Sequence, residues 1–192
     1  MKNEKVIIFD FGSQYTQLIA RRVRELNIYS EIHPFSKDIK IDDSVRAIIL
    51  SGSPYSVRED NAPIPSLDCL NQDIPVLAIC YGAQFLAYNN GGTVSPSKIR
   101  EYGRANLSFF DSNSRLFKGI SSNSQVWMSH GDTITNIPES FKLIASTKEV
   151  DIAAYSINKK NVFGLQFHPE VYHSKDGKKI ISNFLINICN CK

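Results

Sequence analysis

The sequence predicts a single α/β domain with a mixed, largely parallel central sheet flanked by helices and with a β-rich, antiparallel second half. Three observations support this prediction. The chain has 192 residues, of which 42% are hydrophobic and 21% charged, as expected for one domain with a buried core. In the first half, apolar runs alternate with helical patterns, which is typical of a parallel sheet covered on both faces. In the second half, short strand-like runs follow one another closely, which favours antiparallel hairpins.

The first half is expected to alternate strands and helices. Lys5–Phe11 is an apolar run with β-branched residues at its centre, so it predicts a buried strand. The helical spacing of apolar residues after Gly12 predicts a helix over Gln14–Leu26, with Arg22 on its outer side and with Leu18, Ile19, Val23 and Leu26 facing inward. Further strands are expected at Ser30–Pro34, Ala47–Ser51 and Pro75–Cys80. A second helix is expected from about Gly82 to Asn90, and Gly91 and Gly92 terminate it.

The second half has few helical signals before its last helix. Strands are expected at Ala105–Phe110, Gln125–Ser129, Leu143–Ser146, Ile152–Ile157 and Val162–Phe167. A helix is expected over Asp176–Cys189, with Ile180, Ile181, Phe184, Leu185 and Ile188 on its inner face. Because ligands bind beyond the carboxyl ends of parallel strands, the loops that begin at Gly12, Gly52 and Cys80 are expected to converge on one edge of the sheet.

Charge and targeting signals argue against several classes of partner. The chain has 22 Lys and Arg against 19 Asp and Glu, and a net charge of +3 is too small to indicate nucleic acid or an anionic membrane. No apolar run approaches the roughly 20 residues that span a bilayer. The N-terminus lacks the apolar length and the cleavage site of a signal peptide. A cytoplasmic protein is therefore expected.

The four cysteines lack the spacing of a disulfide framework or of a zinc site, so no metal is expected. Cys69 is expected on the inner face of a short helix, Cys189 in helix packing, and Cys191 as a terminal bystander. Cys80 differs from these three because it lies at a strand-to-helix turn.

Cys80 ends an apolar strand, and a helix begins directly after it. This is the arrangement of a nucleophile elbow, in which only small residues fit two positions before and after the nucleophile, and Ala78 and Gly82 are small. The helix N-terminus favours a thiolate, and the Tyr81 N–H points to where an oxyanion would form. A buried cysteine at the end of a core strand would give the same local pattern.

A second motif, His168-Pro169-Glu170, can supply the base that a cysteine nucleophile needs. Residues two apart on an extended chain point to the same side, so Glu170 can reach the imidazole and orient it. By itself the motif is more typical of a solvated strand end. Together with Cys80 it completes a possible Cys-His-Glu triad.

A third motif, Ser51-Gly52-Ser53-Pro54, follows a predicted strand. A glycine loop at this place can put the Gly52 N–H where an oxyanion develops. By itself, an ordinary turn explains this loop better.

Taken together, the Cys80 motif, the loop at 51–54 and His168-Pro-Glu170 resemble the class I (triad-type) glutamine amidotransferase family, whose fold is flavodoxin-like. Residues 10–24 and 126–132 are more specific and resemble the amidotransferase domains of GMP synthases. The resemblance covers essentially the whole chain, so residues 1–192 are expected to form one amidotransferase domain. No segment resembles the nucleotide loop of an ATP-pyrophosphatase (synthetase) domain, so that domain is expected to be absent from this chain. Residues 183–192 resemble the last helix of the amidotransferase domain, just before the synthetase domain would begin, so a fragment of a two-domain protein is favoured over a free-standing subunit.

The resemblance implies a complete set of catalytic roles. It implies that Cys80 attacks the side-chain amide of L-glutamine and forms a γ-glutamyl thioester that water hydrolyses, and that His168 is the acid and base, oriented by Glu170. It implies an oxyanion hole made by the backbone N–H groups of Gly52 and Tyr81. It also implies contacts with bound glutamine from Gln84, Ser129, His130, Gly131 and Asp132. For His130, a contact with the partner domain is the alternative.

The resemblance further implies a partner for the ammonia that is released. It would pass to a synthetase domain that has adenylylated XMP, giving GMP. ATP and Mg²⁺ would be needed only in that domain, and no cofactor is expected in this one. The chain departs from the family at Ser53 and Ala78, where glycine is usual, and neither change removes a catalytic group.

Two other functions remain open. The chain could be a docking or regulatory module of a synthetase with little glutaminase activity of its own, which an intact triad does not exclude. A cysteine hydrolase or chaperone of the DJ-1-like kind also uses an elbow cysteine, but it lacks a His168-Pro-Glu170 partner.

Several residues outside the triad are expected to have no catalytic role. His33 is expected at the surface end of a strand, His173 has no assigned role, and Trp127 is expected in the core or at an interface. A solvated surface is expected, in preference to a docking face, for Lys98, Arg100 and Arg104.

Overall fold

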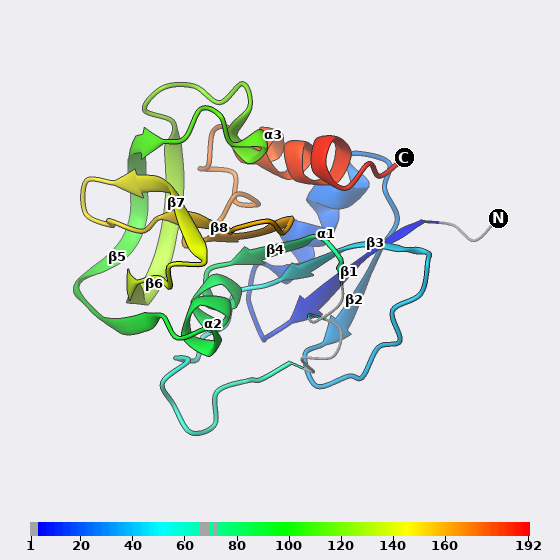
Figure 1. Cartoon of the computed structure of the whole chain (residues 1–192), viewed down its shortest axis with the longest axis horizontal. Coiled ribbons are helices and arrows are strands. Elements are labelled where there is room, and N and C mark those ends of the chain that lie inside the picture. The colour runs from blue at the N-terminus through cyan, green and yellow to red at the C-terminus, as the bar shows by residue number, and fades with distance from the viewer. Residues whose placement is uncertain (1–3, 66–69, 71–72) are drawn as a thin grey trace.

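The computed structural model describes residues 4–65, 70 and 73–192 of the chain. Cys69 and the side chains of Lys98 and Arg100 lie outside the described part. Within it, one nine-stranded sheet has the order β2-β1-β3-β4-β9-β8-β7-β5-β6 (Figure 1). Helices lie on both faces of this sheet, so the predicted single-domain α/β fold is confirmed.

One half of the sheet is parallel. It holds the strands β2 (Ser30–Pro34), β1 (Lys5–Asp10), β3 (Val45–Leu50), β4 (Val76–Ile79) and β9 (Val162–Leu165). Helix α1 (Thr16–Arg24) connects β1 to β2, and helix α2 (Tyr81–Asn89) follows β4. Because β9 pairs with β4, the end of β9 lies next to the turn that follows β4.

The other half of the sheet is antiparallel. It holds β8 (Ala154–Ile157), β7 (Phe141–Thr147), β5 (Thr93–Phe110) and β6 (Gln125–Asn136). The remaining elements are a 3₁₀ turn η2 (Arg115–Phe117), helix α3 (Gly177–Ser182) and a π-helical segment η3 (Asn183–Ile188).

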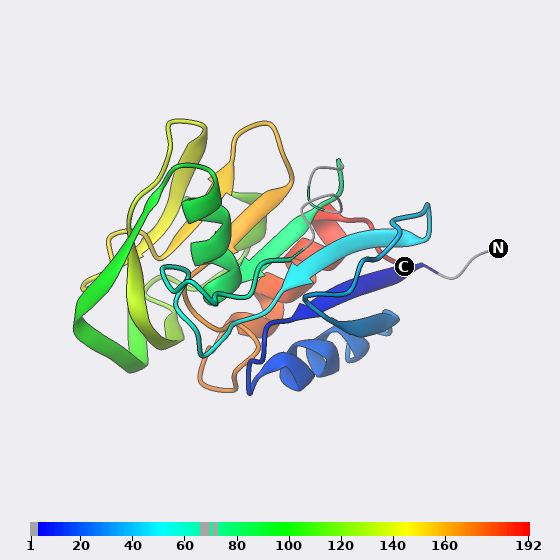
Figure 2. The same ribbon diagram turned by 90° about the horizontal axis from the view of Figure 1, so that it is seen from below.

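The apolar core has two layers, one on each face of the sheet. Along β1, Val6 and Ile8 belong to the layer that contains residues of α1 and α3, whereas Ile7 and Phe9 belong to the layer that contains residues of α2. Figure 2 shows α1 and α2 on opposite sides of the sheet. Successive side chains of a strand point to opposite faces, so a strand covered on both sides is apolar at nearly every position.

The largest departure from the sequence-based expectation is the length of β5 and β6. The strand β5 begins at Thr93 instead of Ala105, and β6 continues to Asn136 instead of ending at Ser129. The additional residues pair with each other in a two-stranded ribbon, for example Ser95 with Thr133. Much of this ribbon is polar, and it therefore lacks the apolar pattern by which a strand is recognised in sequence.

The predicted C-terminal helix is present, but only its first part is α-helical. The backbone changes to a π-helix at Asn183, while all five residues expected on the inner face are buried. Cys189 is buried as expected. The prediction for Cys191 is wrong, because its side chain is 5% exposed and its N–H donates to Leu185 O at 2.9 Å.

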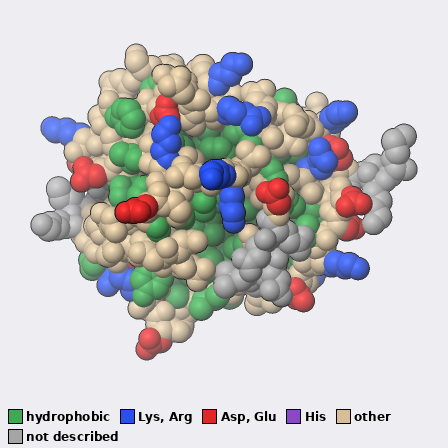
Figure 3. All heavy atoms as spheres, in the orientation of Figure 1, with side chains coloured by type: hydrophobic (Ala, Val, Ile, Leu, Met, Phe, Trp, Pro, Cys, Tyr) green, Lys and Arg blue, Asp and Glu red, His purple; other side chains and the backbone are tan. Residues whose placement is uncertain are grey.

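Basic and acidic side chains are interspersed on the face drawn in Figure 3. Arg104 is exposed, as expected for a solvated residue. His33 is more enclosed than expected, since its side chain is 17% exposed and its Nε2 lies 2.9 Å from Glu31 Oε2. In the part of the chain that is described, no helix combines the length and the apolar character required to cross a membrane.

Candidate active site

Cys80 lies in a strained turn between β4 and α2. Its backbone has φ 52° and ψ −106°, a region that residues other than glycine rarely adopt. The Cys80 N–H donates to Leu165 O at 2.7 Å, and the Gln84 N–H donates to Cys80 O at 3.0 Å. The turn is thus attached to β9 on one side and to the first turn of α2 on the other. The predicted strand Pro75–Cys80 ends one residue early because Cys80 has this conformation.

Close packing explains why the turn requires small neighbours. A Cβ atom on Gly82 would lie 2.6 Å from the Leu50 Cβ and 3.0 Å from the Leu50 O. The Gly82 N–H also donates to Ser51 O at 3.1 Å, which holds the turn against the end of β3. Ala78 is fully buried in β4 opposite Leu50, so its methyl group is accommodated within the sheet.

His168 and Glu170 follow β9 and form a buried pair beside this turn. The His168 Nδ1 lies 2.6 Å from Glu170 Oε1, and the two side chains are 3% and 0% exposed. The backbone N–H of His168 donates to Trp127 O at 2.9 Å, and the Ser174 hydroxyl donates to His168 O. The two side chains meet as the sequence predicts, but the backbone between them is a turn and not the extended chain expected, since the Val171 N–H donates to His168 O at 3.4 Å.

Neighbouring charges control the ionisation of His168. Burial alone would lower the pKa of the imidazole, but the negative charges of Glu170 and of the Cys80 sulfur outweigh it. The net effect raises the pKa of His168 well above its usual value, so the imidazolium form is stabilised. The pair can therefore hold a proton beside the Cys80 sulfur.

The two residues whose backbone N–H groups are expected to form an oxyanion hole, Gly52 and Tyr81, lie next to Cys80. A Cβ on Gly52 would lie 3.3 Å from His168 Cε1 and 3.6 Å from Cys80 Cβ, so the Gly52 backbone lies directly against both side chains. Tyr81 is the first residue of α2, where an N–H has no acceptor within the helix. Its side chain is buried, and its hydroxyl donates to Pro63 O at 2.7 Å.

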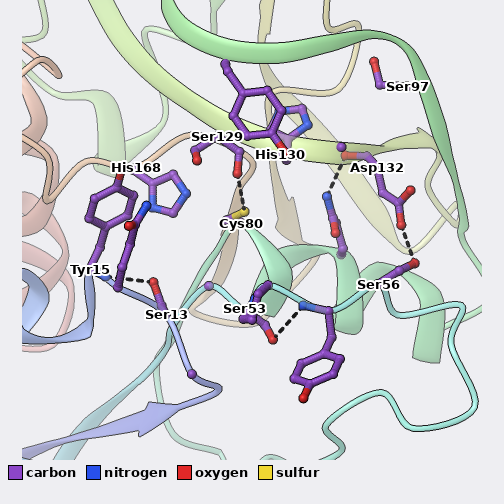
Figure 4. A pocket seen from close by; sticks show the side chains of 18 of the residues that line it. Ser13, Tyr15, Ser53, Ser56, Cys80, Ser97, Ser129, His130, Asp132 and His168 are labelled. Carbon is purple, nitrogen blue, oxygen red and sulfur yellow. Dashed lines mark hydrogen bonds between the residues drawn. The ribbon is translucent and has the colours of Figure 1, made fainter.

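A pocket of about 820 Å³ opens above Cys80, and Figure 4 shows how its side chains are arranged. Gly12, Gly52 and Cys80 all line it, so the three loops converge as predicted. The wall opposite the loops is formed by β6, which contributes residues 129–132, and Ser129 O lies 3.7 Å from the Cys80 Sγ. Figure 4 places Cys80 between His168 on one side and Asp132 on the other.

Gln84 connects the Cys80 turn to the β6 wall. Its Nε2 donates to Asp132 O at 2.8 Å and approaches Gln166 Oε1 at 3.4 Å. The Gln84 side chain lines the pocket but is 3% exposed, so it both faces the ligand space and positions the wall.

His130 also lines the pocket from β6 and is 4% exposed. Burial lowers the pKa of its imidazole to about 4. His130 is therefore a neutral side chain at physiological pH.

A family model described as Glutamine amidotransferase class-I matches residues 7–188. The chain belongs to this family. It is 57% identical over 188 residues to the glutamine-hydrolyzing GMP synthase of Cytophaga hutchinsonii, with 98% of this chain and 37% of the relative covered. It is 58% identical over 189 residues to the relative of the same name in Phocaeicola vulgatus, with the same coverage. The chain thus spans little more than a third of the length of these curated relatives.

Two crystal structures resemble this amidotransferase chain. A Thermoplasma acidophilum protein described as a subunit of GMP synthase has a TM-score of 0.87 and 32% identity, covering 99% of this chain and 96% of that one. A Thermotoga maritima glutamine amidotransferase has a TM-score of 0.80 and 18% identity, covering 98% of this chain and 99% of that one, which supports the fold alone.

In this amidotransferase, Ser53 stands where the family resemblance implies a glycine. Its hydroxyl accepts the Tyr55 N–H at 3.2 Å, a local turn contact that turns the side chain toward the following residues (Figure 4). The loop therefore has a side-chain hydrogen bond of its own, and Gly52 remains next to His168 and Cys80.

Sequence reasoning missed several residues around the amidotransferase site. Arg22, expected on the outer side of α1, is half-buried, and its Nε donates to Glu170 O at 3.1 Å. The Tyr15 ring lies edge-on to His168, with 5.0 Å between ring centroids. Gln166 is buried and accepts the Ile134 N–H at 3.1 Å. The only sequence signal for these residues was their position in the chain. Tyr15 and Arg22 lie within residues 10–24, which resemble the amidotransferase domains of GMP synthases, and Gln166 lies two positions before His168.

The Trp127 and His173 rings pack against each other at a tilt, with 4.7 Å between ring centroids. Trp127, expected in the core or at an interface, is half-buried. The structure places His173 outside the residues that line the pocket.

Proposed function

We propose that this chain hydrolyses L-glutamine to glutamate and ammonia with Cys80 as nucleophile. The observation that supports this most strongly is the elbow conformation of Cys80 beside a buried His168–Glu170 pair whose nearest atoms are 2.6 Å apart. This arrangement supplies a nucleophile, a base and an orienting carboxylate, which is what acyl transfer from an amide requires.

The proposed reaction has two halves. The Cys80 thiolate attacks the γ-carboxamide carbon, and the Gly52 and Tyr81 N–H groups stabilise the tetrahedral oxyanion. His168 then donates its proton to the leaving nitrogen, so that ammonia departs and a γ-glutamyl thioester remains. In the second half His168 removes a proton from water, the hydroxide attacks the thioester, and the protonated imidazole returns its proton to the sulfur.

The α-carbon end of glutamine is proposed to bind at the β6 wall. Residues Ser129, His130, Gly131 and Asp132 line the pocket there, and Gln84 joins this wall to the nucleophile turn. A small zwitterion fits a pocket of about 820 Å³.

The ammonia is proposed to serve GMP synthesis from XMP. Relatives that are 57% and 58% identical are named glutamine-hydrolyzing GMP synthases, and this chain matches 37% of their length. We propose that residues 1–192 form their amidotransferase domain and that adenylylation of XMP, with ATP and Mg²⁺, takes place in a separate synthetase domain. The amidotransferase domain would need no metal or cofactor, nucleic acid or membrane, and would act in the cytoplasm.

The direct test is glutamate release from L-glutamine by the purified chain, measured alone and with a synthetase domain. We expect release above background in at least one condition, with stimulation by the partner. If neither condition gives glutamate, the alternative of a docking or regulatory module is favoured.

The pH dependence of the reaction tests the role of Glu170. Its charge raises the pKa of His168, and the alkaline limb of kcat/KM follows loss of the His168 imidazolium. Removing the charge in Glu170→Gln lowers the pKa of His168, so the limb is expected to move to lower pH. The measurement is kcat/KM against pH for both proteins. An unchanged alkaline limb would show that Glu170 does not control the charge of His168.

A further inference from the structure

An ion pair that sequence reasoning did not identify lies at the pocket. Arg58 belongs to the segment between β3 and β4, and Asp132 belongs to β6. The Arg58 Nη2 lies 2.9 Å from Asp132 Oδ1, and its Nε donates to Oδ2 at 3.4 Å. The hydroxyl of Ser56, from the same segment, also donates to Asp132 Oδ2. Both oxygens of the carboxylate are therefore held by this segment.

The ion pair has a defined place relative to the nucleophile. Asp132 O accepts a hydrogen bond from Gln84 Nε2 at 2.8 Å, and the Gln84 N–H donates to Cys80 O at 3.0 Å. Figure 4 shows the Asp132 carboxylate on the side of Cys80 away from His168. A ligand whose amide reaches Cys80 can thus extend toward the ion pair.

The chemistry of glutamine matches this pair. With its γ-amide at Cys80, glutamine still carries an ammonium and a carboxylate group on its α carbon. Among the described residues that line the pocket, Arg58 is the side chain with a permanent positive charge. Two of its five N–H donors serve Asp132, and its side chain is 39% exposed, so donors remain for a second carboxylate.

We propose that Arg58 binds the α-carboxylate of L-glutamine while Asp132, held by Arg58 and Ser56, binds the α-ammonium group. The two charged groups of glutamine and the two of the ion pair then alternate in sign. The Arg58–Asp132 pair therefore selects free glutamine over glutamine that is blocked at the α-carboxylate. This inference rests on the proposed function and extends it, because it assigns a specificity role to Arg58.

The test compares L-glutamine with its α-amide, which keeps the ammonium group and the side chain but lacks the carboxylate. Binding is measured by calorimetry on the Cys80→Ala protein, so that no turnover is needed. Arg58→Ala, made in this background, is expected to weaken binding of glutamine about 10- to 100-fold, the range for a hydrogen-bonded charge pair. It is expected to change binding of the α-amide by less than about threefold.

Two control variants separate recognition from structure. Arg21→Ala removes a matched arginine, 72% exposed and paired with Glu25 at 3.3 Å, that does not line the pocket. It is expected to leave the preference for glutamine unchanged. Arg58→Lys keeps the positive charge but lacks the planar guanidinium, and it is expected to retain part of the preference for glutamine over its α-amide. This variant also tests the inference if Arg58→Ala disturbs the structure of the loop.

The outcomes distinguish this inference from the proposed function. Equal losses for glutamine and its α-amide would overturn the inference and leave Arg58 as a structural tie to Asp132. Tighter glutamine binding in Arg58→Ala would overturn it too, because the arginine would then be blocking Asp132. Glutamine binding that depends on Arg58, in a protein that releases no glutamate, would support the inference and contradict the glutaminase function. Absence of glutamine binding would overturn both.

Discussion

Cys80→Ala is expected to lower glutamate release by about 10⁴-fold or more, in the presence or absence of a synthetase domain. The reason is that every later step acts on the thioester, and alanine offers no atom that can form it. The side chain is buried and lines the pocket, and removing one sulfur atom is expected to leave the turn and the backbone of Gly52 and Tyr81 in place. The measurement is the initial rate of glutamate formation, together with glutamine binding to confirm that the pocket is intact.

The matched control is Cys189→Ala. Cys189 is also buried and also free, but it lies at the end of η3 and does not line this pocket. Its replacement is expected to leave the rate of glutamate release unchanged. Activity that survives Cys80→Ala would show that another group is the nucleophile.

His168→Ala is expected to lower kcat for glutamate release by about 10²- to 10⁴-fold, the usual contribution of general acid–base catalysis. Without the imidazole, the reaction loses the proposed proton donor for the departing ammonia and the proposed base for the hydrolytic water. The variant also leaves the Glu170 carboxylate buried without its 2.6 Å partner, so some loss of stability is expected. A thermal unfolding curve must therefore accompany the kinetics.

His173→Ala is the control for His168→Ala. His173 is close in sequence, packs against Trp127 and does not line the pocket. We expect kcat within about twofold of the unmodified chain. Equal losses in the two variants would mean that the effect of His168→Ala arises from the fold of this segment and not from proton transfer.

Local patterns were sufficient to predict most of the parallel half of the sheet. Buried parallel strands are apolar throughout, so β1, β3 and β4 are visible as runs. The Cys80 turn is similarly local, because the small residues that it requires lie within two positions of it. The His168–Glu170 pair is local too, since the two residues are two positions apart in one short turn.

The long β5–β6 ribbon could not be predicted in the same way. Its strands have many polar residues, and their register depends on pairing with each other and not on burial of a face. The π-helical change at Asn183 has no sequence signal that differs from that of an α-helix, because the inner face remains apolar.

The sequence by itself determined the nature of the site, namely the cysteine elbow, its histidine and carboxylate partners, and the family to which they belong. Only the tertiary structure decided which distant groups complete it. Arg22 reaches the Glu170 carbonyl, and Arg58 reaches Asp132, across segments that are far apart in the chain. The physical reason is that periodicity and turn chemistry report the immediate neighbours of a residue, whereas these contacts form only after strands from both halves of the chain have paired into one sheet.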